Sequence, residues 1–149
     1  MTFKVLGAIL TPYIRLNGVS KMTPLSFTRV QTDGSFRRTH PKSRVAAVIT
    51  GPDANDRRSA VLEITARSST ETEWASVAFG LQFALSRDHD TIALENDNLS
   101  VIHGLIFRAP LKHEYARYYR NEIEQMSKQT LWTGVRWIPR EINKADKLF

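Results

Sequence analysis

Four carboxylates lie at points of the 149-residue chain where a predicted strand ends or a predicted helix begins: Asp33, Glu73, Asp97 and Asp146. Strand ends of one sheet can converge, and carboxylates gathered there repel one another unless cations compensate, which raises some of their pKa values. Their oxygens are the ligands that hard divalent ions such as Mg²⁺ and Mn²⁺ accept. Two such ions can activate a water and stabilise the leaving oxygen of a phosphodiester. The pattern therefore points to nuclease chemistry.

Each acid also has an ordinary local interpretation. Glu73 is an acid in the first turn of a predicted helix, Asp97 can cap the next helix, and Asp33 follows a strand in a turn. Taken singly, none of these acids establishes a site.

The elements that must position these acids follow the order βββαβααβ. Strands are predicted over 27–31, 44–50, 60–66, 91–95 and 132–138. The first helix carries an apolar stripe over 74–85, with Ser69 or Thr70 as its cap. The second helix carries apolar residues over 99–106, with Asp97 or Asn98 as its cap, and a third spans about 111–128. Three strands joined by turns predict an antiparallel meander, and the later alternation adds parallel neighbours in a mixed sheet with helices packed on it.

The first 24 residues look detached from this pattern, because Pro12, Gly18 and Pro24 interrupt short apolar pieces. We predict an N-terminal extension over 1–24 of undefined role, and a single α/β domain over 25–149. The extension is either an extra strand or arm, or a start-site extension with little function, since Met22 lies just before the first strand of the pattern.

Composition narrows the class of partner. Twenty-one Lys and Arg against fifteen Asp and Glu give a net charge of +6, which favours a polyanion such as nucleic acid. The absence of cysteine excludes disulfides, thiol nucleophiles and Cys-ligated zinc, and the four histidines show no metal-ligand spacing. The longest early apolar run, over 5–10, is far shorter than the roughly twenty residues of a membrane span. We therefore expect a soluble, cytoplasmic protein with no membrane partner.

Four short motifs, in this order along 26–148, resemble ribonuclease H of the plant and archaeal type 1 kind. The motifs are Thr32-Asp33-Gly34-Ser35, Thr72-Glu73-Trp74-Ala75, Asn96-Asp97-Asn98 and the ending from Ile138 to Leu148. That ending is similar to the family pattern Pro-Arg-Glu-x-Asn-x-x-Ala-Asp-x-Leu and is the most specific of the four. The resemblance implies a ribonuclease H-like α/β fold with a five-stranded mixed sheet, three strands antiparallel and two further strands parallel, and with helices on both faces.

The resemblance also implies an endonuclease that hydrolyses the RNA strand of RNA–DNA hybrids with two Mg²⁺ ions, or Mn²⁺, per site. Asp33 would bridge both ions, Asp146 would complete the site of the water-activating ion, and Glu73 with Asp97 would complete the other. The implied substrate contacts are Gly34, Ser35, Ser68, Ser69, Thr70 and Arg140. As an alternative, the two serines and Thr70 are plain helix-capping residues, and Arg140 forms a surface salt bridge. Outside the motifs, the best candidates for phosphate contacts are basic residues at two turns, which could also be plain solvated turns: Arg37, Arg38, Lys42 and Arg44 beside the first strand, with Arg57 and Arg58 at the next turn.

Three departures from the family matter. Asn98 replaces the usual Ser after the second Asp, and the loop before Asp146 has no His, so that Arg140 is the best stand-in. The chain ends at Phe149, so the closing helix that anchors the last acid in the family is missing or reduced to a stub. From this we expect low activity, manganese dependence or reliance on dimer contacts, with monomer and homodimer both open.

Two alternative functions also remain. The shortened end suggests a nucleic-acid-binding module that keeps the fold without turnover. Another nuclease of the same superfamily, such as an enzyme that cuts four-way DNA junctions, is the other alternative, and the motifs argue against it.

Overall fold

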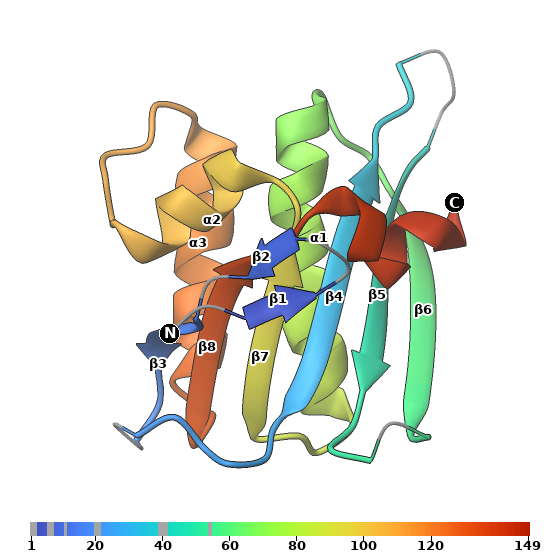
Figure 1. Ribbon diagram of the computed structural model, residues 1–149. Coiled ribbons are helices and arrows are strands. Elements are labelled where there is room, and N and C mark those ends of the chain that lie inside the picture. Colours follow the sequence, from blue (N-terminus) through green and yellow to red (C-terminus); the bar gives the residue numbers. More distant parts are fainter. Residues whose placement is uncertain (1–2, 6–7, 11, 20–21, 39–41, 54) are drawn as a thin grey trace.

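The computed structural model describes residues 3–5, 8–10, 12–19, 22–38, 42–53 and 55–149. A six-stranded mixed sheet in the order β3-β8-β7-β4-β5-β6 lies at its centre (Figure 1). Its strands are β3 (Ile14–Asn17), β4 (Thr28–Ser35), β5 (Ser43–Thr50), β6 (Arg57–Ile64), β7 (Thr91–Asn96) and β8 (Trp132–Trp137). A separate two-stranded sheet pairs β1 (Phe3–Val5) with β2 (Ala8–Leu10).

Strands β4, β5 and β6 form the predicted antiparallel meander, because short connections suffice between antiparallel neighbours. Strand β7 then pairs in parallel with β4, and β8 pairs in parallel with β7. These parallel pairs need helical crossovers, which α1 (Ser69–Ser86), α2 (Leu99–Ile106) and α3 (Glu114–Ser127) supply. The mixed sheet predicted from the alternation of elements is confirmed.

The predicted number of five strands is wrong, because the N-terminal segment adds a sixth. Strand β3 pairs antiparallel with β8, with Ile14 opposite Val135 and Arg15 opposite Gly134. Four residues are too short to show a periodic pattern, and this strand forms by pairing with a distant edge rather than through local preference. Residues 14–17 therefore form the extra strand that was one of the two alternatives for the N-terminal extension.

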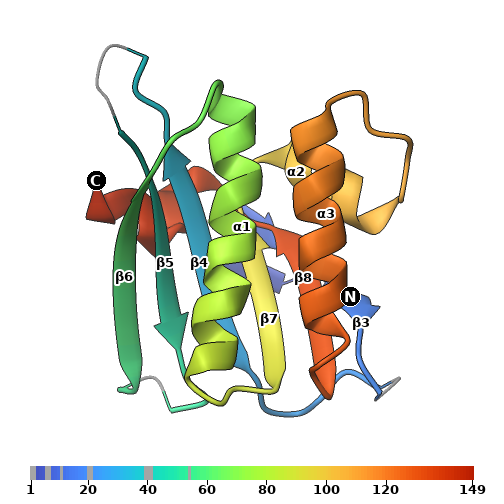
Figure 2. The same ribbon diagram turned by 180° about the vertical axis from the view of Figure 1, so that it is seen from behind.

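Helices α1 and α3 cover one face of the sheet (Figure 2). The main core lies beneath them, and α2 contributes Val101, Ile102 and Leu105 to it. Helix α1 begins one or two residues earlier than predicted, because Ser68 has extended backbone and its hydroxyl accepts the N–H of Glu71 at 3.1 Å. The expectation that Ser69 or Thr70 caps this helix is therefore wrong. None of the helices in the described ranges is long and apolar enough to cross a membrane.

The opposite face carries two short 3-10 helices, η1 (Arg140–Ile142) and η2 (Lys144–Leu148) (Figure 1). Ala145 of η2 is fully buried against Ala46 and Val48 of β5. Helical segments thus lie on both faces of the sheet, with α-helices on one and 3-10 helices on the other. Because side chains alternate along a strand, β4 directs Val30 towards the α-helices and Gln31 towards η2.

Two glycines bring α1 close to β4. A Cβ on Gly80 would lie 2.3 Å from Cγ2 of Thr32, and a Cβ on Gly34 would lie 2.8 Å from the carbonyl oxygen of Thr72. Side chains larger than hydrogen would push the helix away from the strand. This close contact sets Glu73 of α1 beside Asp33 of β4, which is the first step in building the site.

Candidate metal site

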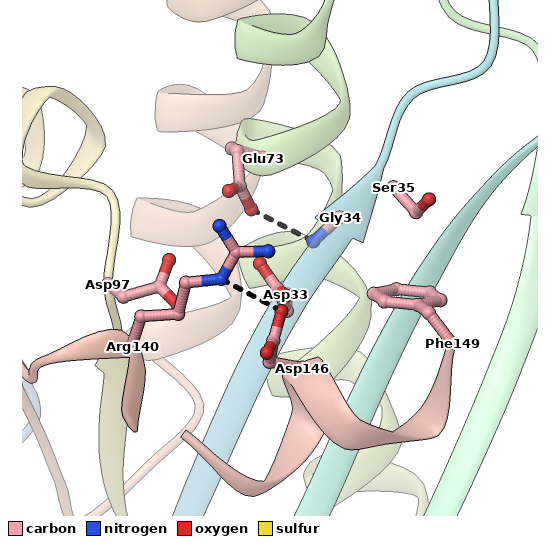
Figure 3. Close-up of a pocket in the computed structure, with 8 residues that line it drawn as sticks. All are labelled: Asp33, Gly34, Ser35, Glu73, Asp97, Arg140, Asp146 and Phe149. Carbon is pink, nitrogen blue, oxygen red and sulfur yellow. Dashed lines mark hydrogen bonds and ion pairs between the residues drawn. The ribbon is translucent and has the colours of Figure 1, made fainter. Parts of the chain in front are cut away.

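Three of the predicted acids meet at one edge of the sheet. Each of Asp33, Glu73 and Asp97 offers a carboxylate oxygen, and these oxygens lie within 4.8 Å of one another. Asp33 comes from β4, Glu73 from α1, and Asp97 from the residue after β7. Figure 3 shows the three side chains around one pocket, which Asp146 also lines. The predicted convergence of the strand ends is present in the structure.

The position of Glu73 depends on β4. Its Oε1 accepts the backbone N–H of Gly34 at 2.9 Å. Because α1 begins at Ser69, Glu73 lies in the second turn of the helix and not in the first. The first-turn interpretation, in which its charge merely faces the helix dipole, therefore does not apply.

Asp97 is held from both its backbone and its side chain. Its carbonyl oxygen accepts from Nε1 of Trp137 at 2.9 Å, and its Oδ2 accepts from Nδ2 of Asn143 at 3.2 Å. Asn143 is fully buried and also donates to the carbonyl oxygen of Thr32 at 2.9 Å. Asn98, which follows Asp97, caps α2 by accepting the N–H of Val101 at 3.0 Å.

Sequence reasoning missed the roles of Asn143 and Trp137. The only sequence signal for Asn143 is its place in the terminal motif, which includes an Asn at this position. Its role depends on contacts with β4 and with the residue after β7, which are remote in sequence, so local pattern could not supply it. The same is true of Trp137, whose partner lies 40 residues away.

Asp146 lies in η2, on the face of the sheet opposite α1 and α3 (Figure 1). It pairs with Arg140, whose Nε lies 3.2 Å from its Oδ1, and the Arg140 side chain is 76% exposed. Of the two predicted interpretations of Arg140, the salt bridge exists, and its partner is an acid of the pocket itself. Arg140 also lines the pocket with Gly34, Ser35 and Phe149 (Figure 3).

The terminal motif departs from the family pattern by one residue. One residue separates Asn143 from Ala145, where the pattern quoted above has two. In a 3-10 helix, positions three apart lie on the same side. Asn143 and Asp146 have that spacing at the start of η2, and both contribute to the acidic site. A 3-10 helix is wound more tightly than an α-helix, so both side chains face the site although the connection between Asn143 and Ala145 is one residue shorter than in the family pattern.

The acidic cluster retains protons because it is buried and like-charged. Burial, followed by the charges of Glu73 and Asp97 and a hydrogen bond to Asp146, raises the pKa of Asp33 to about 9. Burial and the charge of Asp97 raise the pKa of Glu73 to about 7. Burial is also the main cause that raises the pKa of Asp97. A cation among these groups would offset both the repulsion and the loss of solvation.

The donor set fits a hard divalent cation. Every group of the cluster offers carboxylate oxygen, which Mg²⁺ and Mn²⁺ prefer, and it includes neither the imidazole nor the thiolate that softer metals favour. Asp33, Glu73 and Asp97 are the residues that could hold such an ion.

The remaining predicted substrate residues divide between two places. Gly34, Ser35 and Arg140 line the acidic pocket. Ser68 and Ser69 line a second pocket, together with the basic residues Arg37, Arg38 and Arg67. Thr70 lies in the first turn of α1 and lines neither of these pockets. The alternative interpretation as helix-capping residues is confirmed for Ser68 alone, whose hydroxyl accepts the N–H of Glu71.

A mixed sheet with an acidic cluster at the ends of its central parallel strands defines the ribonuclease H-like class, whose members include hydrolytic nucleases. The family model described as reverse transcriptase-like matches residues 31–148. The chain belongs to this family and carries a ribonuclease H domain, as its motifs predicted. No curated protein gives a significant match.

Solved structures support the same fold. RNase H1 from the halophilic archaeon Halobacterium salinarum superimposes with a TM-score of 0.75 at 17% identity, covering 81% of this chain and 92% of that one. The N-terminal RNase H domain of Rv2228c from Mycobacterium tuberculosis gives 0.74 at 20% identity, covering 83% and 90%. LC11-RNase H1 in complex with an RNA/DNA hybrid gives 0.70 at 17% identity, covering 81% and 92%. At these identities the likeness establishes the fold.

Proposed function

We propose that this protein is a divalent-metal-dependent endonuclease that hydrolyses the RNA strand of RNA–DNA hybrids. The observation that carries the proposal is the convergence of Asp33, Glu73 and Asp97, with carboxylate oxygens within 4.8 Å, at the edge of a ribonuclease H-type sheet. The structure of LC11-RNase H1 with an RNA/DNA hybrid supports the choice of substrate. So does the net charge of +6, which favours a polyanion.

Asp33, Glu73, Asp97 and Asp146 would hold two Mg²⁺ or Mn²⁺ ions. When bound, such ions supply an activated water and stabilise the leaving oxygen of the scissile phosphodiester. Asp33 lies among the other three acids around the pocket (Figure 3), so it would contribute to holding both ions. The Gly34 N–H orients Glu73, and the Asn143 amide orients Asp97, so neither carboxylate has to be ordered when substrate arrives.

Selection of a hybrid would rest on shape and charge. An A-like hybrid displays 2′-hydroxyls in a wide minor groove, so little sequence readout is needed. Arg37, Arg38 and Arg67 line the pocket beside the first turn of α1, where they could contact the phosphate backbone of the substrate. Gly34, Ser35 and Arg140, at the acidic pocket, would contact the strand that is cut.

The test is cleavage of an end-labelled RNA–DNA hybrid, beside RNA and DNA duplexes and a four-way DNA junction, with Mg²⁺ or Mn²⁺. We expect the native protein to cut only the RNA of the hybrid, leaving 5′-phosphate ends. Asp33→Asn should abolish cutting while leaving the fold intact. Asp53→Asn, which neutralises an exposed acid in the connection between β5 and β6, is the matched control and should cut like the native protein.

Other results would redirect the assignment. Hybrid binding in a gel-shift assay without metal-dependent cleavage would replace the enzyme with a binding module. Cutting of the junction alone would indicate a different nuclease of the superfamily. Cutting by Asp33→Asn at the native rate would show that the acidic cluster is not the active site.

A further inference from the structure

The face of the sheet that carries η2 also holds a buried polar network, centred on Glu95 of β7. The Glu95 side chain is fully buried, with 0% exposure. Its Oε1 accepts from Arg29 at 2.8 Å and from Gln31 at 2.9 Å. Its Oε2 accepts from Nε of Arg136 at 2.8 Å and from the Tyr13 hydroxyl at 2.5 Å. Four donors, from β4, β8 and the N-terminal segment, thus converge on one carboxylate that the proposed chemistry does not use.

This network sets the orientation of the Gln31 amide. A carboxylate surrounded by donors can only accept, so Gln31 must present its NH₂ group to Glu95. The Gln31 carbonyl oxygen then points the other way, where it accepts the backbone N–H of Lys144 at 3.0 Å. The reversed amide would place oxygen against carboxylate and NH₂ against N–H, and both contacts would be repulsive.

The Gln31–Lys144 contact lies next to the acidic site. Gln31 precedes Asp33 by two residues on β4, so both side chains point to the same face of the sheet. Lys144 precedes Asp146 by two residues in η2. Asp33 and Asp146 both line the acidic pocket. Two polar contacts therefore tie the start of η2 to β4 beside the acids, one from Lys144 to Gln31 and one from the side chain of the cap residue Asn143 to the carbonyl oxygen of Thr32.

We propose that Gln31, oriented by Glu95, is a positioning residue that holds η2 so that Asp146 faces Asp33 in the metal site. The inference rests on the proposed function, because it assigns Asp146 to metal binding. Without the Gln31 contact, η2 would keep the apolar contact of Ala145 and the hydrogen bond of its cap residue Asn143 to Thr32. Its first residue would no longer be fixed to β4, so Asp146, two residues later, would be held less firmly in the site.

Substitutions at Lys144 test this inference without disturbing the buried network. Lys144→Pro removes only the donating N–H and the side chain, and proline suits this place because it is the first residue of η2 and follows Asn143, whose backbone is extended. Lys144→Ala is the matched control, because it removes the same side chain and keeps the N–H. Gln31→Met removes the acceptor at similar volume and is the second, independent variant.

The readout is Mn²⁺ binding to the metal-free protein without substrate, measured by calorimetry and by the electron paramagnetic resonance of free Mn²⁺. We expect Lys144→Pro and Gln31→Met to weaken Mn²⁺ binding about tenfold, the lower end of the range for residues that support metal ligands. Lys144→Ala should bind like the native protein. The Mg²⁺ concentration that gives half-maximal cleavage should shift by the same factor.

A double-variant comparison separates this role from a general loss of stability. In an Asp146→Asn background, Lys144→Pro should cause no further loss of Mn²⁺ affinity, since the residue it positions no longer carries a charge. Native-like Mn²⁺ binding by Lys144→Pro and Gln31→Met, or an equal loss in the Asp146→Asn background, would overturn the inference and leave the proposed function standing. A native protein that neither binds Mn²⁺ nor cleaves the hybrid would overturn the proposed function first, and this inference with it.

Discussion

Metal binding to the acidic cluster should release protons, and their number should fall as the pH rises. In the metal-free protein the pKa of Asp33 is about 9 and that of Glu73 is about 7. At pH 7 Asp33 therefore keeps its proton in nearly every molecule, and Glu73 keeps its proton in about half of them. A carboxylate must be ionised to bind a cation, so filling the site should release about 1.5 protons at pH 7 and about 0.5 at pH 9.

The same competition predicts how affinity changes with pH. Protons occupy the ligand atoms less as the pH rises through the two pKa values, so the Mg²⁺ affinity should increase by about a hundredfold between pH 7 and pH 9. Most of this increase belongs to Asp33, because its pKa lies at the upper end of the interval.

Isothermal titration calorimetry with Mg²⁺ measures both quantities. Titrations in two buffers with different ionisation enthalpies give the number of protons released, and repeating them at each pH gives the affinity. Asp33→Asn should release about one proton fewer than the native protein at pH 7. Binding without proton release at pH 7, with an affinity that does not change up to pH 9, would refute the idea that the acids hold protons against one another.

Three further predictions concern the fold around the site. Asp33→Asn should raise the melting temperature of the metal-free protein at pH 9 by several degrees and change it much less at pH 5. Because the pKa of Asp33 is higher in the folded than in the unfolded protein, ionising Asp33 destabilises the fold, and this loss grows as the pH rises from the unfolded-state pKa towards about 9. Equal shifts of the melting temperature in calorimetry at both pH values would contradict this. Gly80→Ala should lower the free energy of unfolding in urea by about 1–3 kcal/mol, because the added Cβ meets Thr32, and an unchanged midpoint would show that α1 can move away without cost. Ser68→Ala should lower it by about 1 kcal/mol while Ser69→Ala has little effect, and the reverse order would place the helix cap at Ser69.

The sheet and the acidic cluster were predictable because their signals are local. Strand β5 is rich in Val, Ala and Ile, and the turn residues that follow it set the meander. The motifs around Asp33, Glu73 and Asp97 lie at element ends, and the ends of neighbouring parallel strands meet at one edge of a sheet. Placing these acids together therefore required only the order of the elements.

The features that the sequence could not predict depend on contacts between residues that are remote along the chain. Strand β3 forms against β8, more than a hundred residues later. Glu95 is the last residue of the strand predicted over 91–95, and its burial depends on Arg29 and Arg136, which pair with it from the neighbouring strands. The amide contacts of Asn143 depend in the same way on where η2 crosses β4.

Strand β6 has a consequence for how the protein behaves in solution. It is the outermost strand on its side of the sheet within the described residues, it runs for eight residues, and Val61 and Leu62 are 44% and 48% exposed. Such an edge can template pairing with another chain, and charged side chains are a common protection against it. Arg57, Arg58 and Glu63 supply those charges here. Variants that neutralise them for crystallisation or labelling would expose a strand edge prone to aggregation, at a distance from the acidic pocket.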